Sequence, residues 1–314
     1  MSKNTRPRTN IEVCIAVYQR YYRLPEIIKM LNAQTTQKFN LNIWNNSGED
    51  LTPFTVDFPE NRLKIFSGKD NEGSAARFKL VPHTKGECII FIDDDEEFNE
   101  DFIEYFYDKY KEYKDKGEKC ILGWYTRTFV NDRYNPSFDN PPEGAEVDYI
   151  GTGGMVLDRE IFDKEPELQN IPEPFDKVED LYLCYLARTK YNMILRKLAK
   201  KVSIIVDGKD QFHGIDKEEM YVRLRDMNWM ILRDMQLQMN VYDNLVSLQE
   251  VLDELKIPFW LSEGLLLGLY RDGKPIKGDE DDTDVCIWYD HAPRADEIID
   301  GLQKKGFTLL DAWR

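Results

Sequence analysis

The sequence has few of the residues that build zinc-binding or disulfide-linked domains. Its 314 residues include five cysteines and three histidines. The cysteines are odd in number and far apart, and no Cys-x-x-Cys pair occurs, so we expect reduced thiols in the core. A structural zinc site, which needs closely spaced cysteine or histidine ligands, is therefore not expected.

Positive charge is also scarce. The chain has 42 lysines and arginines against 58 aspartates and glutamates, a formal net charge of -16. Proteins that bind nucleic acids need a basic face for the phosphates, so the composition argues against that class. Free nucleotides stay open as ligands, because a bound metal can supply positive charge locally.

Long apolar segments are absent as well. Residues 1–10 are polar and basic and lack the apolar stretch of a signal peptide, and no run approaches transmembrane length. We therefore expect a cytoplasmic protein. With 42% hydrophobic and 12% aromatic residues, the composition is that of a globular protein, and the length predicts a main domain with a second unit.

The most informative feature that is present is a run of five acids, residues 93–97, directly after the apolar run 89–92. The apolar run predicts a buried strand with clustered carboxylates at its carboxyl end. Such carboxylates repel one another unless a cation lies among them, and a divalent metal is usual where a pyrophosphate is held. Taken alone, the cluster would fit a solvated turn and helix cap equally well.

Strand and helix patterns alternate around this run. Over the first ninety residues we expect strands and helices in the order 11–17, 24–32 (helix), 41–44, 63–66, 73–81 (helix) and 88–92. This β-α-β-α order predicts an α/β fold with a mostly parallel, doubly wound, Rossmann-like sheet. Ligands of such sheets bind beyond the carboxyl ends of the strands, where the acids lie.

The same patterns continue to residue 215 and then change. Helices are predicted at 102–113 and 178–190, and strands at 120–128, 149–157 and 202–206. Residues 131–146, which contain three prolines, predict a long loop that is either part of an acceptor pocket or an irregular connection. The pattern at 216–256 is helical and rich in methionine, which is typical of core packing, although such helices could also join two copies of the chain. We therefore divide the chain into residues 1–215, a helical connector at 216–256, and residues 257–314.

Several motifs follow one another in the first segment. Val13–Arg20 is a strand and turn, residues 71–77 read Asn-Glu-Gly-Ser-Ala-Ala-Arg, Phe91–Asp95 ends in an Asp-x-Asp (DXD) sequence, and Glu179 and Asp180 form an acidic pair. In this order they resemble the GT-A glycosyltransferases, especially the family 2-like inverting enzymes, over roughly residues 10–215. The resemblance implies transfer of a sugar from a nucleotide-sugar donor to a glycan hydroxyl, in glycan or surface-polysaccharide synthesis.

The resemblance also implies a donor site. Asp95, Asp93 and His213 would bind Mn²⁺ or Mg²⁺, and the metal would stabilise the diphosphate of a UDP-, GDP- or dTDP-linked donor as it departs. The other residues that would contact the nucleotide are Tyr18, Arg20, Asn45, Asn71, Arg77 and Asp94. Asn45 stands where the family usually has Asp, so the base is not specified.

On the acceptor side the resemblance assigns Asp180 as the general base, whose direct activation of the attacking hydroxyl would invert the anomeric configuration. Glu179, Gly153, Gly154 and Trp124 would lie around the acceptor and donor sugar. Each of these residues also has a structural reading. An acidic pair at a helix start is more often a cap, His213 could be a turn residue, and Arg77 on a helix would usually be a surface charge.

A second acidic motif lies near the end of the chain. Residues 259–271 and 278–287 resemble the LicD/fukutin-like branch of the nucleotidyltransferase fold. The resemblance implies that Ser262 and Gly264 cradle phosphate, with Arg271 nearby, and that Asp282 and Asp284 bind a metal pair. That fold needs a third carboxylate on a later strand, and the sequence stops soon after an apparent strand at 307–310. We therefore expect a partial α+β module, either cut from a longer bifunctional protein or degenerate, without phosphotransfer.

Three other functions remain open. A nucleotidyltransferase that makes an activated sugar would share the fold, but no glycine-rich, basic turn follows the first strand. A non-catalytic glycan-binding scaffold would not need both Asp95 and Asp180. In the third case, a full-length protein would use its LicD-like part to transfer phosphocholine or alditol phosphate from a CDP-linked donor, and the first domain would only bind glycan.

Overall fold

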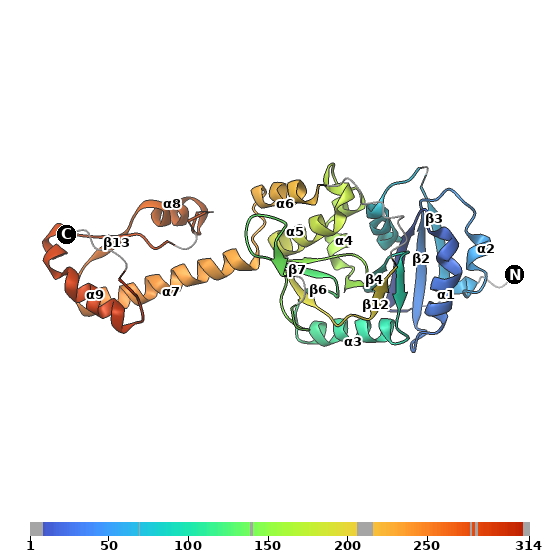
Figure 1. Cartoon of the computed structure of the whole chain (residues 1–314), viewed down its shortest axis with the longest axis horizontal. Helices are drawn as coiled ribbons and strands as arrows, with labels where there is room; N and C mark the ends of the chain where they lie inside the picture. Colours follow the sequence, from blue (N-terminus) through green and yellow to red (C-terminus); the bar gives the residue numbers. More distant parts are fainter. Residues whose placement is uncertain are drawn as a thin grey trace. The chain divides into compact units, whose positions relative to one another are not determined.

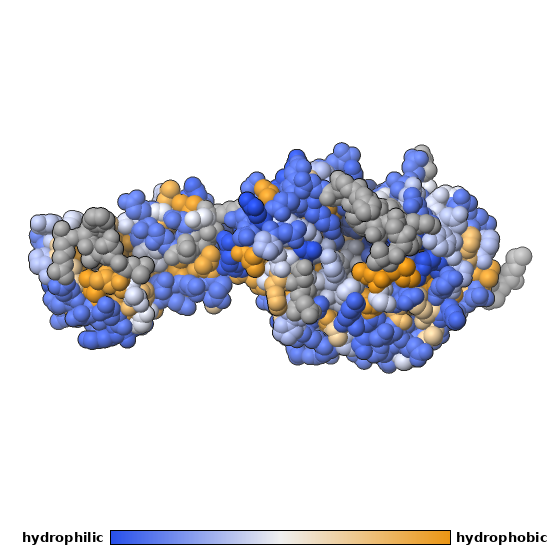
Figure 2. Space-filling view, in the orientation of Figure 1, coloured by the Kyte–Doolittle hydropathy of each residue, from blue (hydrophilic) through white to orange (hydrophobic). Residues whose placement is uncertain are grey.

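The computed structural model describes residues 9–68, 70–138, 141–205, 216–276, 278–279 and 282–309. The chain forms two compact units, Met1–Met230 and Ile231–Arg314. Within the described ranges, no helix has both the length and the apolar character needed to cross a membrane. The face of the molecule shown in Figure 2 is mostly hydrophilic with scattered apolar patches.

A seven-stranded sheet forms the centre of the first unit, in the order β11-β6-β10-β4-β1-β2-β3 (Figure 1). Its strands are β1 (Ile11–Val17), β2 (Phe39–Asn45), β3 (Leu63–Ser67), β4 (Cys88–Ile92), β6 (Cys120–Gly123), β10 (Met155–Asp158) and β11 (Ile194–Lys197). Every neighbouring pair is parallel except those that β10 makes with β4 and β6. The predicted mostly parallel α/β sheet is confirmed, and the carboxyl ends of β1, β2 and β4 lie along one edge.

Helices and turns cover both faces of this sheet. The α-helices of the first unit are α1 (Leu24–Asn32), α2 (Thr52–Thr55), α3 (Phe102–Asp115), α4 (Glu160–Lys164), α5 (Glu179–Tyr191) and α6 (Lys217–Asp226). The 3-10 segments are η1 (Tyr21–Arg23), η2 (Glu60–Arg62), η3 (Ser74–His83), η4 (Pro166–Gln169) and η5 (Phe175–Lys177). Buried residues of α1 and α3 pack in one core with alternate residues of β1 and β4. On the other face Phe91 packs against Phe78 and Phe162. Because side chains alternate along a strand, a strand covered on both faces reads as a continuous apolar run.

Two predicted strands are each divided. Residues 120–128 form β6 and β7 (Thr126–Phe129), and residues 149–157 form β9 (Tyr149–Ile150) and β10. β7 pairs with β9 and with β8 (Ser137–Phe138), away from the central sheet. The second break falls at Gly153 and Gly154, and Gly154 has a φ of +62°, a conformation that an extended strand cannot contain. The predicted helix at 73–81 is a 3-10 segment, η3, with Pro82 inside it. The strand predicted at 202–206 is β12 (Val202–Ile204), which pairs with β5 (Glu96–Phe98).

The helical pattern expected at 216–256 corresponds to two helices, α6 and α7 (Leu232–Glu254). The first unit extends to Met230 and includes α6, whereas α7 belongs to the second unit. α6 ends just before Asn228, which has a φ of +71°. The carboxylate of Asp234 then accepts a hydrogen bond from the Ile231 N–H at 3.1 Å and so caps the start of α7.

The second unit consists of α7 with a small α+β arrangement. Its elements are β13 (Phe259–Leu261), α8 (Glu263–Asp272), β14 (Val285–Ile287), η6 (Tyr289–Arg294) and α9 (Ala295–Lys304). β13 and β14 pair in an antiparallel sheet. A Cβ on Gly301 of α9 would lie 2.5 Å from Val251 of α7, so the glycine allows these two helices to approach closely. The strand expected at 307–310 is not formed by residues 307–309, and residue 310 lies outside the described residues.

A buried carboxylate anchors the amino-terminal edge of the central sheet. Glu12 of β1 is 1% exposed. It accepts hydrogen bonds from Nδ2 of Asn42 at 3.0 Å, from Nδ2 of Asn40 at 3.3 Å, and from the N–H groups of Lys85 and Gly86 at 3.2 Å. One side chain therefore joins β1, β2 and the turn that leads into β4.

We predict that Glu12→Ala lowers the free energy of unfolding by at least about 2 kcal/mol, because it leaves several buried donors without an acceptor. Glu12→Gln is the matched control and should lose less, since its carbonyl oxygen can still accept. Urea unfolding of the full chain measures both. An alanine variant within about 0.5 kcal/mol of the parent would contradict this role for Glu12.

Candidate active site

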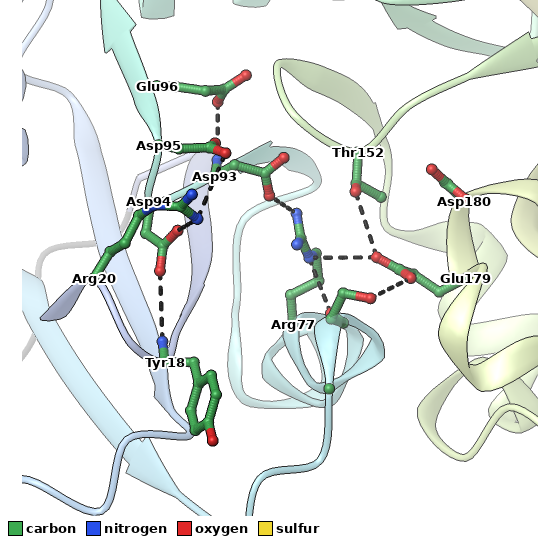
Figure 3. Close-up of polar contacts among 12 residues, drawn as sticks. Tyr18, Arg20, Arg77, Asp93, Asp94, Asp95, Glu96, Thr152, Glu179 and Asp180 are labelled. Atoms are coloured by element: carbon green, nitrogen blue, oxygen red, sulfur yellow. Dashed lines mark hydrogen bonds and ion pairs between the residues drawn. The ribbon is translucent and has the colours of Figure 1, made fainter. Parts of the chain in front are cut away.

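Four carboxylates lie where β4 ends, and we call Asp93, Asp94, Asp95 and Glu96 the acidic cluster (Figure 3). The chain turns after β4 and enters β5 at Glu96. The turn is fixed from inside, because the buried Glu96 carboxylate accepts a hydrogen bond from the Asp93 N–H at 2.8 Å. The predicted strand end with clustered acids is therefore present as a tight turn.

Two buried arginines approach the acidic cluster from different elements. Nη1 of Arg77, on η3, donates a hydrogen bond to Oδ1 of Asp93. Nη1 of Arg20, which follows β1, lies 3.5 Å from Oδ1 of Asp94 and 3.7 Å from Oδ2 of Asp95. The last distance is too long for a hydrogen bond. Asp95 is thus held less closely by these arginines than Asp93 is.

Negative charge remains in excess in the acidic cluster. Burial, and then the charge of Asp93, raises the pKa of Asp95 to about 6. The same two causes raise the pKa of Asp94 and bring the pKa of Glu96 well above its usual range. A divalent cation would relieve this repulsion, and carboxylate oxygen is the donor type that Mg²⁺ and Mn²⁺ prefer.

The protein by itself offers few ligands for such a cation. Among the residues that the structure describes, no three His, Cys, Asp or Glu side chains are placed to hold one metal ion together. His213, the predicted third ligand, lies outside the described residues. A site with one or two carboxylates suits Mg²⁺, which usually takes its remaining oxygen ligands from water and substrate phosphates.

Arg77 also connects the acidic cluster to α5. Its Nε lies 3.8 Å from Oε1 of Glu179, the first residue of that helix. Glu179 is 2% exposed, and it accepts hydrogen bonds from the hydroxyls of Ser74 at 2.5 Å and Thr152 at 3.5 Å. Burial raises the pKa of Glu179 to about 7 although Arg77 opposes the shift. Arg77 is therefore neither a surface charge nor directed at solvent, and its guanidinium lies between two carboxylates (Figure 3).

Asp180 lies beyond Glu179, on the far side of Arg77 from the acidic cluster (Figure 3). Its Oδ1 accepts a hydrogen bond from the Leu181 N–H at 2.8 Å, and its Oδ2 accepts one from the hydroxyl of Tyr149. Nζ of Lys217 lies 4.0 Å from the same Oδ2. The positive end of the α5 dipole also favours a carboxylate at this position. Both oxygens are oriented, and a carboxylate still has lone pairs left for a further donor.

Gly153 and Gly154 make room for side chains of the site. A Cβ on Gly153 would lie 2.6 Å from carboxylate oxygens of both Asp93 and Glu96, and one on Gly154 would lie 2.5 Å from the ring of Trp124. Trp124 itself is 7% exposed. The structure thus places Gly153 beside the acidic cluster and Gly154 beside Trp124, and the glycines let the carboxylates and the indole approach the backbone.

The remaining residues that were predicted to contact the nucleotide, Tyr18, Asn45 and Asn71, divide into two groups. Tyr18 lies at the acidic cluster, where its N–H is 3.5 Å from Oδ2 of Asp94. The amide of Asn45 instead shapes the turn after β2, accepting from the Ser47 N–H and donating to the Glu49 carbonyl. Asn71 similarly accepts from the Gly73 N–H at 3.0 Å. Asn45 and Asn71 therefore organise loops at this edge of the sheet.

Several site residues were not predicted from the sequence: Ser74, Glu96, Tyr149, Thr152 and Lys217. Glu96 belongs to the acid run, but its burial could not be predicted from that run. Ser74 lies inside the 71–77 motif, although no role was assigned to it. Tyr149 and Lys217 carried no local signal, because they contact Asp180 only through the folding of distant segments.

The second predicted site is only partly assembled. Ser262 precedes α8, and its N–H donates to the Asp284 carbonyl at 3.1 Å. A Cβ on Gly264 would lie 1.7 Å from Oδ2 of Asp279. Burial, and then Asp282, raises the pKa of Asp284. Arg271 forms an ion pair at 2.6 Å with its neighbour Asp272.

Comparisons with known proteins match the first unit. The family model "Glycosyl transferase family 2" matches residues 12–171. The uncharacterized glycosyltransferase YwdF of Bacillus subtilis (strain 168) is 32% identical over 95 residues, which are 30% of this chain and 35% of that protein. The uncharacterized glycosyltransferase RC0461 of Rickettsia conorii (strain ATCC VR-613 / Malish 7) is 33% identical over 106 residues, 33% of this chain and 18% of that protein. Both matches span less than two thirds of the relative.

Solved structures match at lower identity. S. aureus TarS has a TM-score of 0.51 and 16% identity, over 75% of this chain and 43% of that chain. TarS 1–349 in complex with UDP has a TM-score of 0.46 and 17% identity, over 62% of this chain and 59% of that chain. The likeness to TarS concerns the fold, and the expected GT-A-like architecture is confirmed. The family model covers half of the chain, and the chain therefore belongs to glycosyl transferase family 2.

Proposed function

We propose that this chain is a metal-dependent, inverting glycosyltransferase that moves a sugar from a nucleotide-sugar donor to a glycan hydroxyl in glycan or surface-polysaccharide synthesis. The observation that carries the proposal is the position of Arg77 between Asp93 and Glu179. One buried side chain thereby joins an acidic cluster suited to a cation and a helix that begins with an oriented carboxylate. A sugar transfer needs both a site for the donor diphosphate and a base for the acceptor hydroxyl.

On the donor side, Asp95 and Asp93 would hold Mn²⁺ or Mg²⁺, and the metal would stabilise the negative charge of the departing diphosphate. The raised pKa of Asp95, its partial exposure and its long distance to Arg20 support this choice. Tyr18 and Arg20 lie beside Asp94 and would contact the nucleotide of a UDP-, GDP- or dTDP-linked donor. His213 stays a predicted ligand.

On the acceptor side, Asp180 would take the proton of the attacking hydroxyl while the bond between the anomeric carbon and the diphosphate oxygen breaks. Direct displacement of this kind inverts the anomeric configuration. The two hydrogen bonds from Tyr149 and Leu181 support the assignment, because a base must be held in one orientation. Glu179 would act indirectly, by keeping Arg77 and α5 in place.

A cytoplasmic location is part of the proposal. Cys88, Cys120 and Cys184 are buried thiols, which fits a reducing compartment.

For the second unit we propose a LicD-like module of the nucleotidyltransferase fold. The contacts of Ser262 and Gly264 with Asp284 and Asp279 support the likeness.

Asp95→Asn tests the donor side. The variant should lower kcat by about 10²–10³-fold, because it removes the carboxylate that binds the charge-stabilising metal. Glu97→Gln is the matched control, since Glu97 is exposed and two residues away, and it should keep the parental rate. Release of nucleoside diphosphate from a panel of nucleotide sugars with Mn²⁺, with and without chelator, measures both. Full activity of the parent in chelator would contradict metal dependence.

Asp180→Asn tests the acceptor side. We expect kcat to fall by about 10²–10⁴-fold while the donor still raises the melting temperature, because a general base is lost and donor binding is not. The anomeric configuration of the parent's product, read by NMR, should be opposite to that of the donor. A retained configuration, or an asparagine variant as fast as the parent, would sink the inverting mechanism.

A further inference from the structure

The helix α6 is packed into the first unit by aromatic side chains. Tyr221 and Trp229 are fully buried. Their ring centroids lie 4.3 and 5.8 Å from that of Phe129 on β7. Burial of three large rings is a strong anchor, since each removes a large apolar area from water. α6 is therefore fixed relative to β7, which pairs with β9, the strand whose Tyr149 contacts Asp180.

Polar contacts join α6 to the loop after β7. The buried guanidinium of Arg225 donates from Nε and Nη2 to Oδ1 of Asp132, at 2.9 and 2.6 Å. The carboxylate of Glu218 accepts from the Tyr134 N–H at 3.1 Å, and the Tyr221 hydroxyl donates to the Asn131 carbonyl at 3.0 Å. The helix thus holds the first part of the predicted 131–146 loop in place.

Lys217 occupies an unusual position for a cation. It is the first residue of α6, and the helix dipole disfavours positive charge in a first turn. The start of the helix is fixed by Asp216, whose carboxylate accepts from the Glu219 N–H at 3.0 Å. A residue that goes against such a local preference, at a position where the backbone is well fixed, often has a functional role.

The ion pair that Lys217 forms with Asp180 supplies a functional reason. Nζ of Lys217 lies 4.0 Å from Oδ2 of Asp180, the oxygen that also accepts from the Tyr149 hydroxyl. The negative charge of Asp180 is the largest cause that raises the pKa of Lys217. Among the described residues, the other titratable groups that interact with Asp180 include Glu179 and Cys184 on α5, Arg77 on η3 and Tyr134 in the loop.

We propose that Lys217 is a positioning residue for Asp180 and that α6 is an integral part of the catalytic unit. The Tyr149 hydroxyl donates a hydrogen bond to Oδ2, and the Lys217 ammonium, at 4.0 Å from the same oxygen, adds an ion pair that favours this position of the ionised carboxylate. This inference rests on the proposed function, in which Asp180 is the base. It adds a residue from a helix that the sequence pattern assigns to a connector.

The experiment compares Lys217→Met with Lys217→Arg in the full chain. We expect Lys217→Met to lower kcat about tenfold or more, with the KM for the donor within about twofold of the parent, because the donor side is untouched. Lys217→Arg should recover most of the rate. Arg223→Met is the control on the same helix, since Arg223 is half-exposed and pairs with Glu219 on the surface.

A double-mutant cycle with Asp180→Asn separates failure of this inference from failure of the proposed function. If Asp180→Asn is inactive but Lys217→Met keeps the parental kcat, the role of Lys217 is overturned and the function stands. If the parent itself transfers no sugar, the test is urea unfolding of the parent, the two single variants Lys217→Met and Asp180→Asn, and the double variant. Non-additive losses of stability support the Lys217–Asp180 link, and additive losses overturn it.

Discussion

The buried guanidinium of Arg77 is the interaction on which the rest of the site depends. Burial opposes its charge, but Asp93 and Glu179 raise its pKa and keep it ionised. Removing one partner of a buried ion pair costs about 3–5 kcal/mol, because the other charge is left without compensation. Arg77 therefore fixes the distance between the turn after β4 and the start of α5, and with it the spacing of donor and acceptor groups.

The surrounding backbone is shaped to fit this charge network. Gly153 lies where any side chain would collide with Asp93 and Glu96, and the turn at Gly154 divides the expected strand and sends β9 toward Asp180. Tyr149 on β9 then orients the base. The arrangement leaves the acidic cluster with excess negative charge, which is unfavourable in the free protein and favourable for a cation and the diphosphate that it accompanies.

Much of the central sheet could be predicted because buried strands and amphipathic helices have strong local patterns. β1, α1 and β4 occupy the residues expected for them. The divided strands were missed, since a continuous apolar run does not reveal the left-handed turn at Gly154. The pairing of Arg77 and the approach of Lys217 to Asp180 could not be predicted either, because their partners are distant in sequence. The break between α6 and α7 includes the positive φ of Asn228, which the hydrophobic pattern of the sequence does not predict.

The most direct measurement of the central claim is the activity of Arg77→Met, a variant that keeps much of the side-chain volume but removes the charge. Glycan transfer and donor hydrolysis by water should be measured on the same folded protein. If Arg77 joins the two halves of the site, both reactions should fall together by about 10²-fold or more, because the turn after β4 and the start of α5 then lose the charge that holds them together. A folded variant that transfers sugar at the parental rate would contradict the account.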